Sequence, residues 1–106
     1  FLDGLVTRGV EGVVLLSGDI HRSEMLQLAA PAGGYDLPEL TSSPLANTWS
    51  TCRGSGEQRV CVDDANSFIV LDIDTSIADP SIEVQVVDGA ARERGSWLLL
   101  RSELSL

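Results

Sequence analysis

SIEVQV at residues 81–86 is the clearest indication of the fold class, because its apolar and polar side chains alternate. In an extended chain its three β-branched residues would share one face, which predicts a half-buried antiparallel strand. Two further apolar stretches of strand length, residues 68–73 and 97–100, lie on either side of it. Asp88 and Gly89 form a turn dipeptide after the strand. We therefore expect the C-terminal third of the chain to consist of strands.

The N-terminal segment combines a helix with a strand. Residues 1–8 carry apolar side chains at helical spacing, and Gly9 follows as a residue suited to end the helix. Residues 13–16 are an unbroken apolar run between glycine-containing turns. Such a run is typical of a strand that is buried on both faces. A helix followed by a buried strand is half of an α/β unit.

The middle of the chain predicts a hairpin and then a long irregular segment. Residues 25–30 could form a short helix or a strand. Because the turn-forming residues 31–34 separate them from the apolar segment 35–41, we favour a hairpin of these two segments. Pro38 lacks an amide hydrogen, which would confine its strand to a sheet edge or a bulge. Residues 42–66 show no regular pattern, and loops of this length are commonly functional or disordered.

Composition limits the classes of partner. Seven Lys and Arg against sixteen Asp and Glu give the 106-residue chain a net charge of −9. Nucleic acids and anionic membranes require a basic surface, so we expect neither as a partner. No apolar run approaches the ~20 residues needed to span a bilayer. The chain opens at Phe1 as if within a helix and carries no targeting signal, which suggests a fragment or a processed piece of a longer protein.

Two cysteines, Cys52 and Cys61, lie in the irregular segment. They permit a single disulfide, which would suit an exported protein. Two unrelated free thiols are the alternative. Their spacing matches no zinc motif.

Asp19 and His21 are the strongest candidate site residues. They follow the predicted strand at 13–16, and ligands bind at the carboxyl ends of strands in open α/β sheets. Gly18 would let the backbone approach a ligand or adopt a strained angle. In an extended segment the two side chains would point to the same side, and both are ligands for divalent metals. The alternative is a surface loop in which Asp19 caps a turn and His21 packs.

The sequence around these residues resembles the PhoD-like (alkaline phosphatase D) metallophosphatases. GVVLLSGDIH at residues 12–21 is similar to the family's last metal-binding motif, a Ser-Gly-Asp-x-His loop after a buried strand, and Glu24 follows as an acidic residue often does there. YDLPELTSSPL at 35–45 is similar to a second family motif. Residues 66–74 and 82–89 resemble later family strands more weakly. The resemblance covers about residues 1–90, in order.

The resemblance implies a fold, an activity and a compartment. The fold would be α+β and β-rich, part of a four-layer α/β/β/α sandwich to which this chain contributes one helix end and about five to six strands. The activity would be the hydrolysis of phosphate mono- or diesters by a periplasmic or extracellular enzyme. Such an enzyme uses two metal ions, calcium and iron or similar divalent metals.

For this chain, the resemblance implies a partial site. Residues 1–106 would be the C-terminal part of a single metallophosphatase domain, supplying strands of one sheet and the metal ligands Asp19 and His21. The other ligands belong to family motifs that do not occur in this chain, and no residue here is assigned a catalytic role. The chain alone is therefore expected to be inactive. Its partners would be a small phosphate ester and the remainder of the domain.

Several alternatives stay open. Residues 63–66 could form a calcium loop, although a solvated turn is the more common role of such residues. Arg22 could contact a substrate phosphate or form a surface pair with Glu24. Trp49 could line a cleft or anchor its loop, whereas Trp97 is expected in the core. A different class of protein also fits: a small exported acidic β-rich binding module with a Cys52–Cys61 disulfide and no catalytic role.

Overall fold

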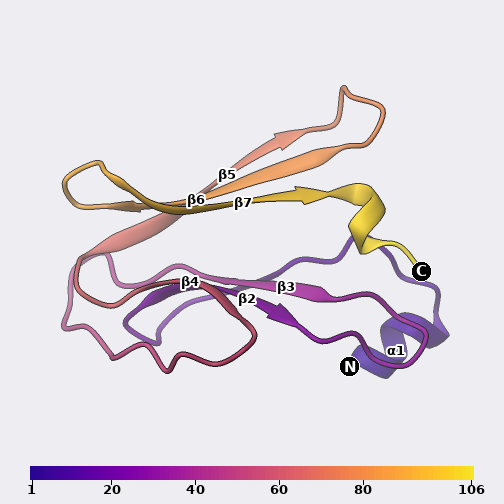
Figure 1. Ribbon diagram of the computed structural model, residues 1–106, viewed down its shortest axis with the longest axis horizontal. Coiled ribbons are helices and arrows are strands. Elements are labelled where there is room, and N and C mark those ends of the chain that lie inside the picture. The colour runs from indigo at the N-terminus through magenta and orange to yellow at the C-terminus, as the bar shows by residue number, and fades with distance from the viewer.

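The computed structural model describes all 106 residues as two facing β-sheets with a short helix at one end (Figure 1). The N- and C-termini lie at the same end of the molecule as the helix. The elements, in chain order, are α1 (Leu2–Thr7), β1 (Leu15–Ser17), β2 (Ser23–Leu28), β3 (Leu37–Thr41), β4 (Gln58–Val62), β5 (Ser67–Asp74), β6 (Ser81–Asp88), β7 (Glu93–Leu100) and a 3-10 helix, η1 (Arg101–Leu104).

The structure confirms that the chain is β-rich with a short helix, as predicted. One sheet has four strands in the order β1-β3-β2-β4, and the other has three in the order β5-β6-β7. The three-stranded sheet is an antiparallel meander whose strands contain the predicted segments 68–73, 81–86 and 97–100. The chain thus contains strands of two sheets, not of one as expected.

Helix α1 ends as the sequence predicts. Gly9 has a positive φ of 64°, which glycine adopts without steric cost. Its amide donates to Val6 O, and the amide of Val10 donates to Leu5 O. This pair of hydrogen bonds is the Schellman arrangement, which satisfies carbonyls at the end of the helix.

The predicted hairpin is confirmed, but the expectation for Pro38 is wrong. Strands β2 and β3 pair antiparallel, and β3 is an inner strand because β1 pairs parallel to its other side. Pro38 is tolerated there because β1 begins opposite Glu39 and does not reach it. On the other side, its partner Gln27 donates its amide to Glu57 O, away from β3. The missing amide hydrogen of Pro38 therefore costs no ladder bond.

The strand expected at residues 13–16 is shorter and more exposed than predicted. Strand β1 begins at Leu15, and Leu16 is 67% exposed. The expectation of burial on both faces is wrong, because β1 is an edge strand and no layer covers Leu16. An apolar run alone does not distinguish a central strand from the edge of a sheet.

The segment 42–66 is not wholly irregular, since strand β4 lies within it and pairs with β2. Alternating apolar residues were too few to reveal this strand. The disulfide is present and joins Cys52 to Cys61 in β4, with their Cα atoms 6.2 Å apart. The alternative of two free thiols is therefore set aside.

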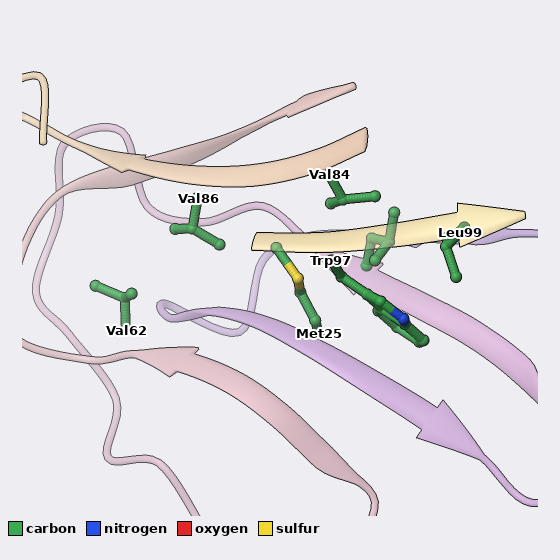
Figure 2. Packing of buried hydrophobic residues seen from close by; sticks show 7 residues of the cluster. Met25, Val62, Val84, Val86, Trp97 and Leu99 are labelled. Carbon is green, nitrogen blue, oxygen red and sulfur yellow. The ribbon is translucent and has the colours of Figure 1, made fainter. Parts of the chain in front are cut away.

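The hydrophobic core lies between the two sheets (Figure 2). Met25 of β2 is fully buried against the other sheet, and Trp97 of β7 is 9% exposed, as predicted for a core residue. The guanidinium of Arg59 lies 4.5 Å from the centre of the Trp97 ring. The buried members of this cluster are Met25, Leu40, Val62, Val84, Val86, Trp97 and Leu99.

A second, smaller cluster fixes α1 and η1 to the end of the four-stranded sheet. Its buried residues are Tyr35, Leu37 and Leu104, and Leu2 and Leu5 of α1 pack against them. The Tyr35 hydroxyl donates to Val10 O at 3.2 Å and accepts from the Val13 amide at 3.3 Å. No helix of the structure has the length and apolar character needed to cross a membrane.

The turn between β6 and β7 is organised by the buried carboxylate of Asp88. It accepts hydrogen bonds from the amides of Arg92 and Ala90 and from the guanidinium groups of Arg92 and Arg94. The backbone hydrogen bond from Arg92 is the largest cause that holds the pKa of Asp88 below its usual value.

We predict that Met25→Ala lowers the free energy of unfolding by about 2–5 kcal/mol, because it leaves a cavity between the sheets. Leu16→Ala is the matched control, because Leu16 is 67% exposed and should change stability by less than about 0.5 kcal/mol. Urea unfolding monitored by circular dichroism measures both. Equal losses in the two variants would contradict the proposed core.

We also predict that Asp88→Asn destabilises the protein most at neutral pH. A carboxyl group whose pKa is lowered by folding stabilises the folded state above its unfolded pKa of about 4 and loses that effect as the pH falls. The difference in melting temperature between wild type and variant should be constant above about pH 5 and shrink below pH 4. A difference that does not depend on pH would show that the charge of Asp88 is unimportant.

Candidate functional site

Asp19 and His21 both lie on the loop between β1 and β2, directly after the carboxyl end of β1. The premise of an extended segment is wrong, because both residues have positive φ angles, 70° for Asp19 and 59° for His21. Gly18, expected to carry any strain, has an ordinary φ, and a Cβ there would meet Ser42 O at an ordinary contact distance of 3.5 Å. The unusual backbone conformation therefore falls on the two candidate ligands themselves.

Left-handed backbone at two non-glycine residues so close together is uncommon. Asp and His tolerate it better than most residue types, yet it still costs free energy that the surroundings must supply. Such conformations concentrate at functional sites. The side chains of Asp19 and His21 make no hydrogen bond or ion pair within the chain, and Asp19 is exposed while His21 is half-buried. Both side chains are therefore available to bind a metal ion or another ligand.

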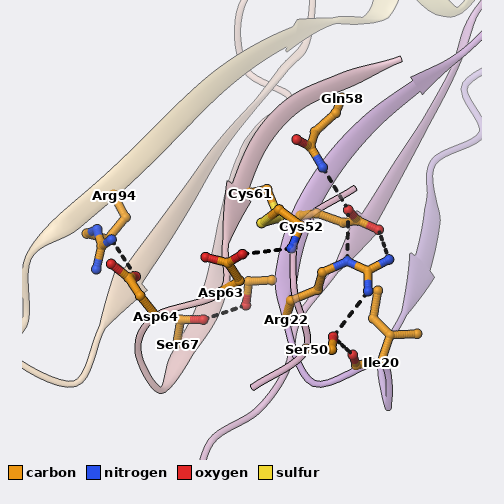
Figure 3. Close-up of a disulfide and its surroundings, with 12 residues drawn as sticks. Ile20, Arg22, Ser50, Cys52, Gln58, Cys61, Asp63, Asp64, Ser67 and Arg94 are labelled. Carbon is orange, nitrogen blue, oxygen red and sulfur yellow. Dashed lines mark hydrogen bonds and ion pairs between the residues drawn. A yellow bond between two sulfur atoms is a disulfide. The ribbon is translucent and has the colours of Figure 1, made fainter. Parts of the chain in front are cut away.

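A network of polar side chains supports the loop between β1 and β2 (Figure 3). Arg22 donates from Nε to Glu24 Oε2 at 3.3 Å and from Nη1 to Ser50 Oγ at 3.1 Å. Gln58 of β4 donates to the same carboxylate oxygen of Glu24 at 3.2 Å. The side chains of Arg22 and Glu24 are 13% and 7% exposed, so this is a nearly buried ion pair.

This network decides between the alternatives for Arg22. The pairing with Glu24 is confirmed, but the description of Arg22 as a surface residue is wrong, because its side chain is only 13% exposed and is bonded to both Glu24 and Ser50. The Glu24 carboxylate is bonded to Arg22 and Gln58, so it is not available as a metal ligand beside Asp19 and His21. Sequence reasoning missed this role because the covering residues lie more than 25 positions away.

Ser50 is a site residue that sequence reasoning did not identify. Its amide donates to His21 O at 2.8 Å, and its hydroxyl donates to Ile20 O. The sequence feature that comes nearest to indicating a role for Ser50 is its position two residues before Cys52.

The other candidate metal loop, residues 63–66, is occupied by internal contacts. Asp63 Oδ2 accepts from the amide of Cys52 at 2.7 Å, and Asp64 forms an ion pair with Arg94 at 2.7 Å. Trp49 is half-exposed and donates from its indole nitrogen to Asn66 Oδ1 at 3.0 Å, so it fastens its loop to this turn. No group of three or more His, Cys, Asp or Glu side chains in the structure is arranged to hold a metal ion. Asp19 and His21 are therefore at most part of a coordination shell.

Comparison with protein-family models, with curated proteins and with solved structures finds no match for the chain.

We predict that Arg22→Met lowers the free energy of unfolding by about 1–3 kcal/mol, because the nearly buried Glu24 carboxylate loses its charged partner. The double variant Arg22→Met with Glu24→Leu should recover part of that loss, since it leaves no unpaired charge. Urea unfolding of the single and double variants provides the comparison. A single variant as stable as wild type would show that the pair does not support the loop.

Proposed function

We propose that this chain supplies a metal-binding loop, with Asp19 and His21 as ligands, to a metal-dependent phosphatase or phosphodiesterase of the PhoD-like type. The observation that carries the proposal is the loop after β1, where both candidate ligands have left-handed backbone and free side chains. Strain of this kind persists only where the surroundings enforce it. The resemblance of residues 12–21 and 35–45 to the family motifs supports the same assignment.

The donor types suit the metals that the resemblance implies. A carboxylate favours hard cations such as calcium, and a neutral imidazole suits iron and related ions. Asp19 would bind through a carboxylate oxygen and His21 through a ring nitrogen. Two ligands are fewer than a binuclear centre needs, so the rest of the coordination shell would come from the remainder of the domain.

The loop's own residues divide into metal ligands and supports. A pair of bound cations would activate a water molecule and stabilise the charge that develops on the phosphoryl group. Arg22 would not contact the phosphate, because Glu24 and Ser50 occupy its guanidinium. The contribution of this loop to the hydrolysis of a phosphate ester is therefore to hold metal rather than to bind substrate.

The outer face of the β5-β6-β7 sheet supports a place in a larger, four-layer domain. Ile69 and Leu71 pack toward the core, so Phe68 and Val70 point to the other face, where both are 39% exposed. Leu98 of β7 also lies opposite the core and is 55% exposed. An α-helical layer, as in an α/β/β/α sandwich, would bury these side chains.

A small exported binding module remains the second candidate function. The Cys52–Cys61 disulfide and a core enclosed between two sheets favour it. The disulfide favours a periplasmic or extracellular location under either proposal, because disulfides persist in oxidising compartments. The two candidates differ in one respect, since only the metallophosphatase proposal requires Asp19 and His21 to bind a metal.

We predict that Mn²⁺ selectively broadens the NMR signals of residues 18–22, with weak affinity in about the millimolar range. Asp19→Asn and His21→Asn should abolish the selective broadening, and asparagine tolerates left-handed backbone, so the loop conformation should survive. Asp3→Asn removes the same charge from the exposed helix α1 and is the matched control for nonspecific attraction to an acidic chain.

Broadening spread evenly over acidic residues, or unchanged in Asp19→Asn and His21→Asn, would refute the metal site and leave the binding module. The chain alone should not hydrolyse nitrophenyl phosphate, because its coordination shell is incomplete. Metal-dependent hydrolysis that His21→Asn abolishes would show instead that the chain contains a complete site.

A further inference from the structure

We propose that Ser50, fixed in place by the Cys52–Cys61 disulfide, is the positioning residue for the Asp19–His21 loop, so that the redox state of the disulfide controls metal binding. This inference deepens the proposed function and rests on it for its metal. It concerns residues that make no contact with the metal and act only through the loop backbone.

Ser50 contacts three consecutive residues of the loop. Its amide binds His21 O, its hydroxyl donates to Ile20 O, and the same hydroxyl accepts from Nη1 of Arg22. The Ile20 and His21 carbonyls belong to the two peptide units that flank His21, and the first of these units begins one residue after Asp19. The Ser50 hydroxyl holds the Ile20 carbonyl and the Ser50 amide holds the His21 carbonyl, so Ser50 restricts rotation of the backbone around His21.

Ser50 itself lies in a segment without regular secondary structure, so something else must hold it in position. Cys52, two residues later, is bonded to Cys61 of β4, and its amide donates to Asp63 Oδ2 just beyond β4. These two attachments fasten the segment to the four-stranded sheet (Figure 3).

The contacts close into a ring. Cys61 lies opposite Glu24 in the pairing of β4 with β2, and Glu24 binds Arg22, which in turn binds Ser50. Every step from the loop to Ser50, through the disulfide to β4 and back through Glu24 is a covalent bond, a hydrogen bond or a ladder pair. Cutting the ring at the disulfide removes its one covalent cross-link and leaves the Ser50 segment held by hydrogen bonds alone, such as those of Trp49 and Cys52, while β2 and β4 stay paired.

The disulfide is placed so that it can be cut. Both cysteines are only half-buried, which allows access to a thiol reagent. A dithiol reductant would transfer two electrons and two protons, converting the disulfide to two thiols while the reductant becomes a cyclic disulfide. In the oxidised protein Ser50 holds the loop firmly. In the reduced protein the Ser50 segment keeps only its hydrogen bonds, so the loop is held less firmly and samples other conformations.

The test uses the full chain, oxidised and reduced with dithiothreitol, with Ser50→Ala, Ser50→Thr and Ser55→Ala as variants. Hydrogen exchange at the amide of residue 50 reports its bond to His21 O, and Mn²⁺ broadening of residues 18–22 reports metal binding. We expect reduction and Ser50→Ala each to speed that exchange and weaken Mn²⁺ binding about three- to tenfold. Ser50→Thr keeps a hydroxyl and should rescue binding, and Ser55→Ala, at an exposed residue of the same segment, should change neither.

The exchange of amides in β5–β7 verifies that each form is folded. Unchanged exchange and Mn²⁺ binding in the reduced protein and in Ser50→Ala would overturn the inference. If reduction prevents folding, Ser50→Ala and Ser50→Thr decide alone. Faster exchange at residue 50 without Mn²⁺ binding in any form would overturn the metallophosphatase proposal and the control of metal binding together, and would keep only the mechanical role of Ser50.

Discussion

The structure depends on the burial of apolar side chains between its two sheets. Neither sheet could be stable alone, because each has one apolar face that must be removed from water. Met25 of β2 and Trp97 of β7 belong to the same buried cluster, although they are separated by 72 positions in the chain. Because β2 is paired on both sides, its position also fixes those of β3 and β4.

A polar contact accompanies the apolar one at one end of the sheets. Ser67 at the start of β5 donates to Ser23 Oγ at the start of β2. The Ser23 hydroxyl also donates to the backbone carbonyl of Ser43 and accepts from the amide of Ser43. These fully paired hydroxyls are buried without penalty, because each has a partner. They place the start of β2, and with it the loop that carries Asp19 and His21, against the second sheet.

The candidate site follows from this arrangement. Once β2 is fixed, the loop between β1 and β2 has few residues in which to turn, and the two candidate ligands take the left-handed conformation. The network of Arg22, Glu24 and Ser50 then holds the loop from the side of β4. The candidate ligands and their unusual conformation lie in one short loop, but the support comes from β2, from the segment around Ser50 and from β4, which is why a short motif alone could not describe the site.

Local alternation and turn chemistry were enough to predict the β-rich class, the strands of the C-terminal third, the β2–β3 hairpin and the end of α1 at Gly9. It also singled out Asp19 and His21 as candidate residues. The remaining features depend on contacts between distant parts of the chain. The exposure of Leu16, the tolerance of Pro38 in an inner strand and the existence of β4 depend on which strands become neighbours. The burial of Arg22 and the contacts of Ser50 join residues 28 to 30 positions apart, and no local pattern encodes a contact over that separation.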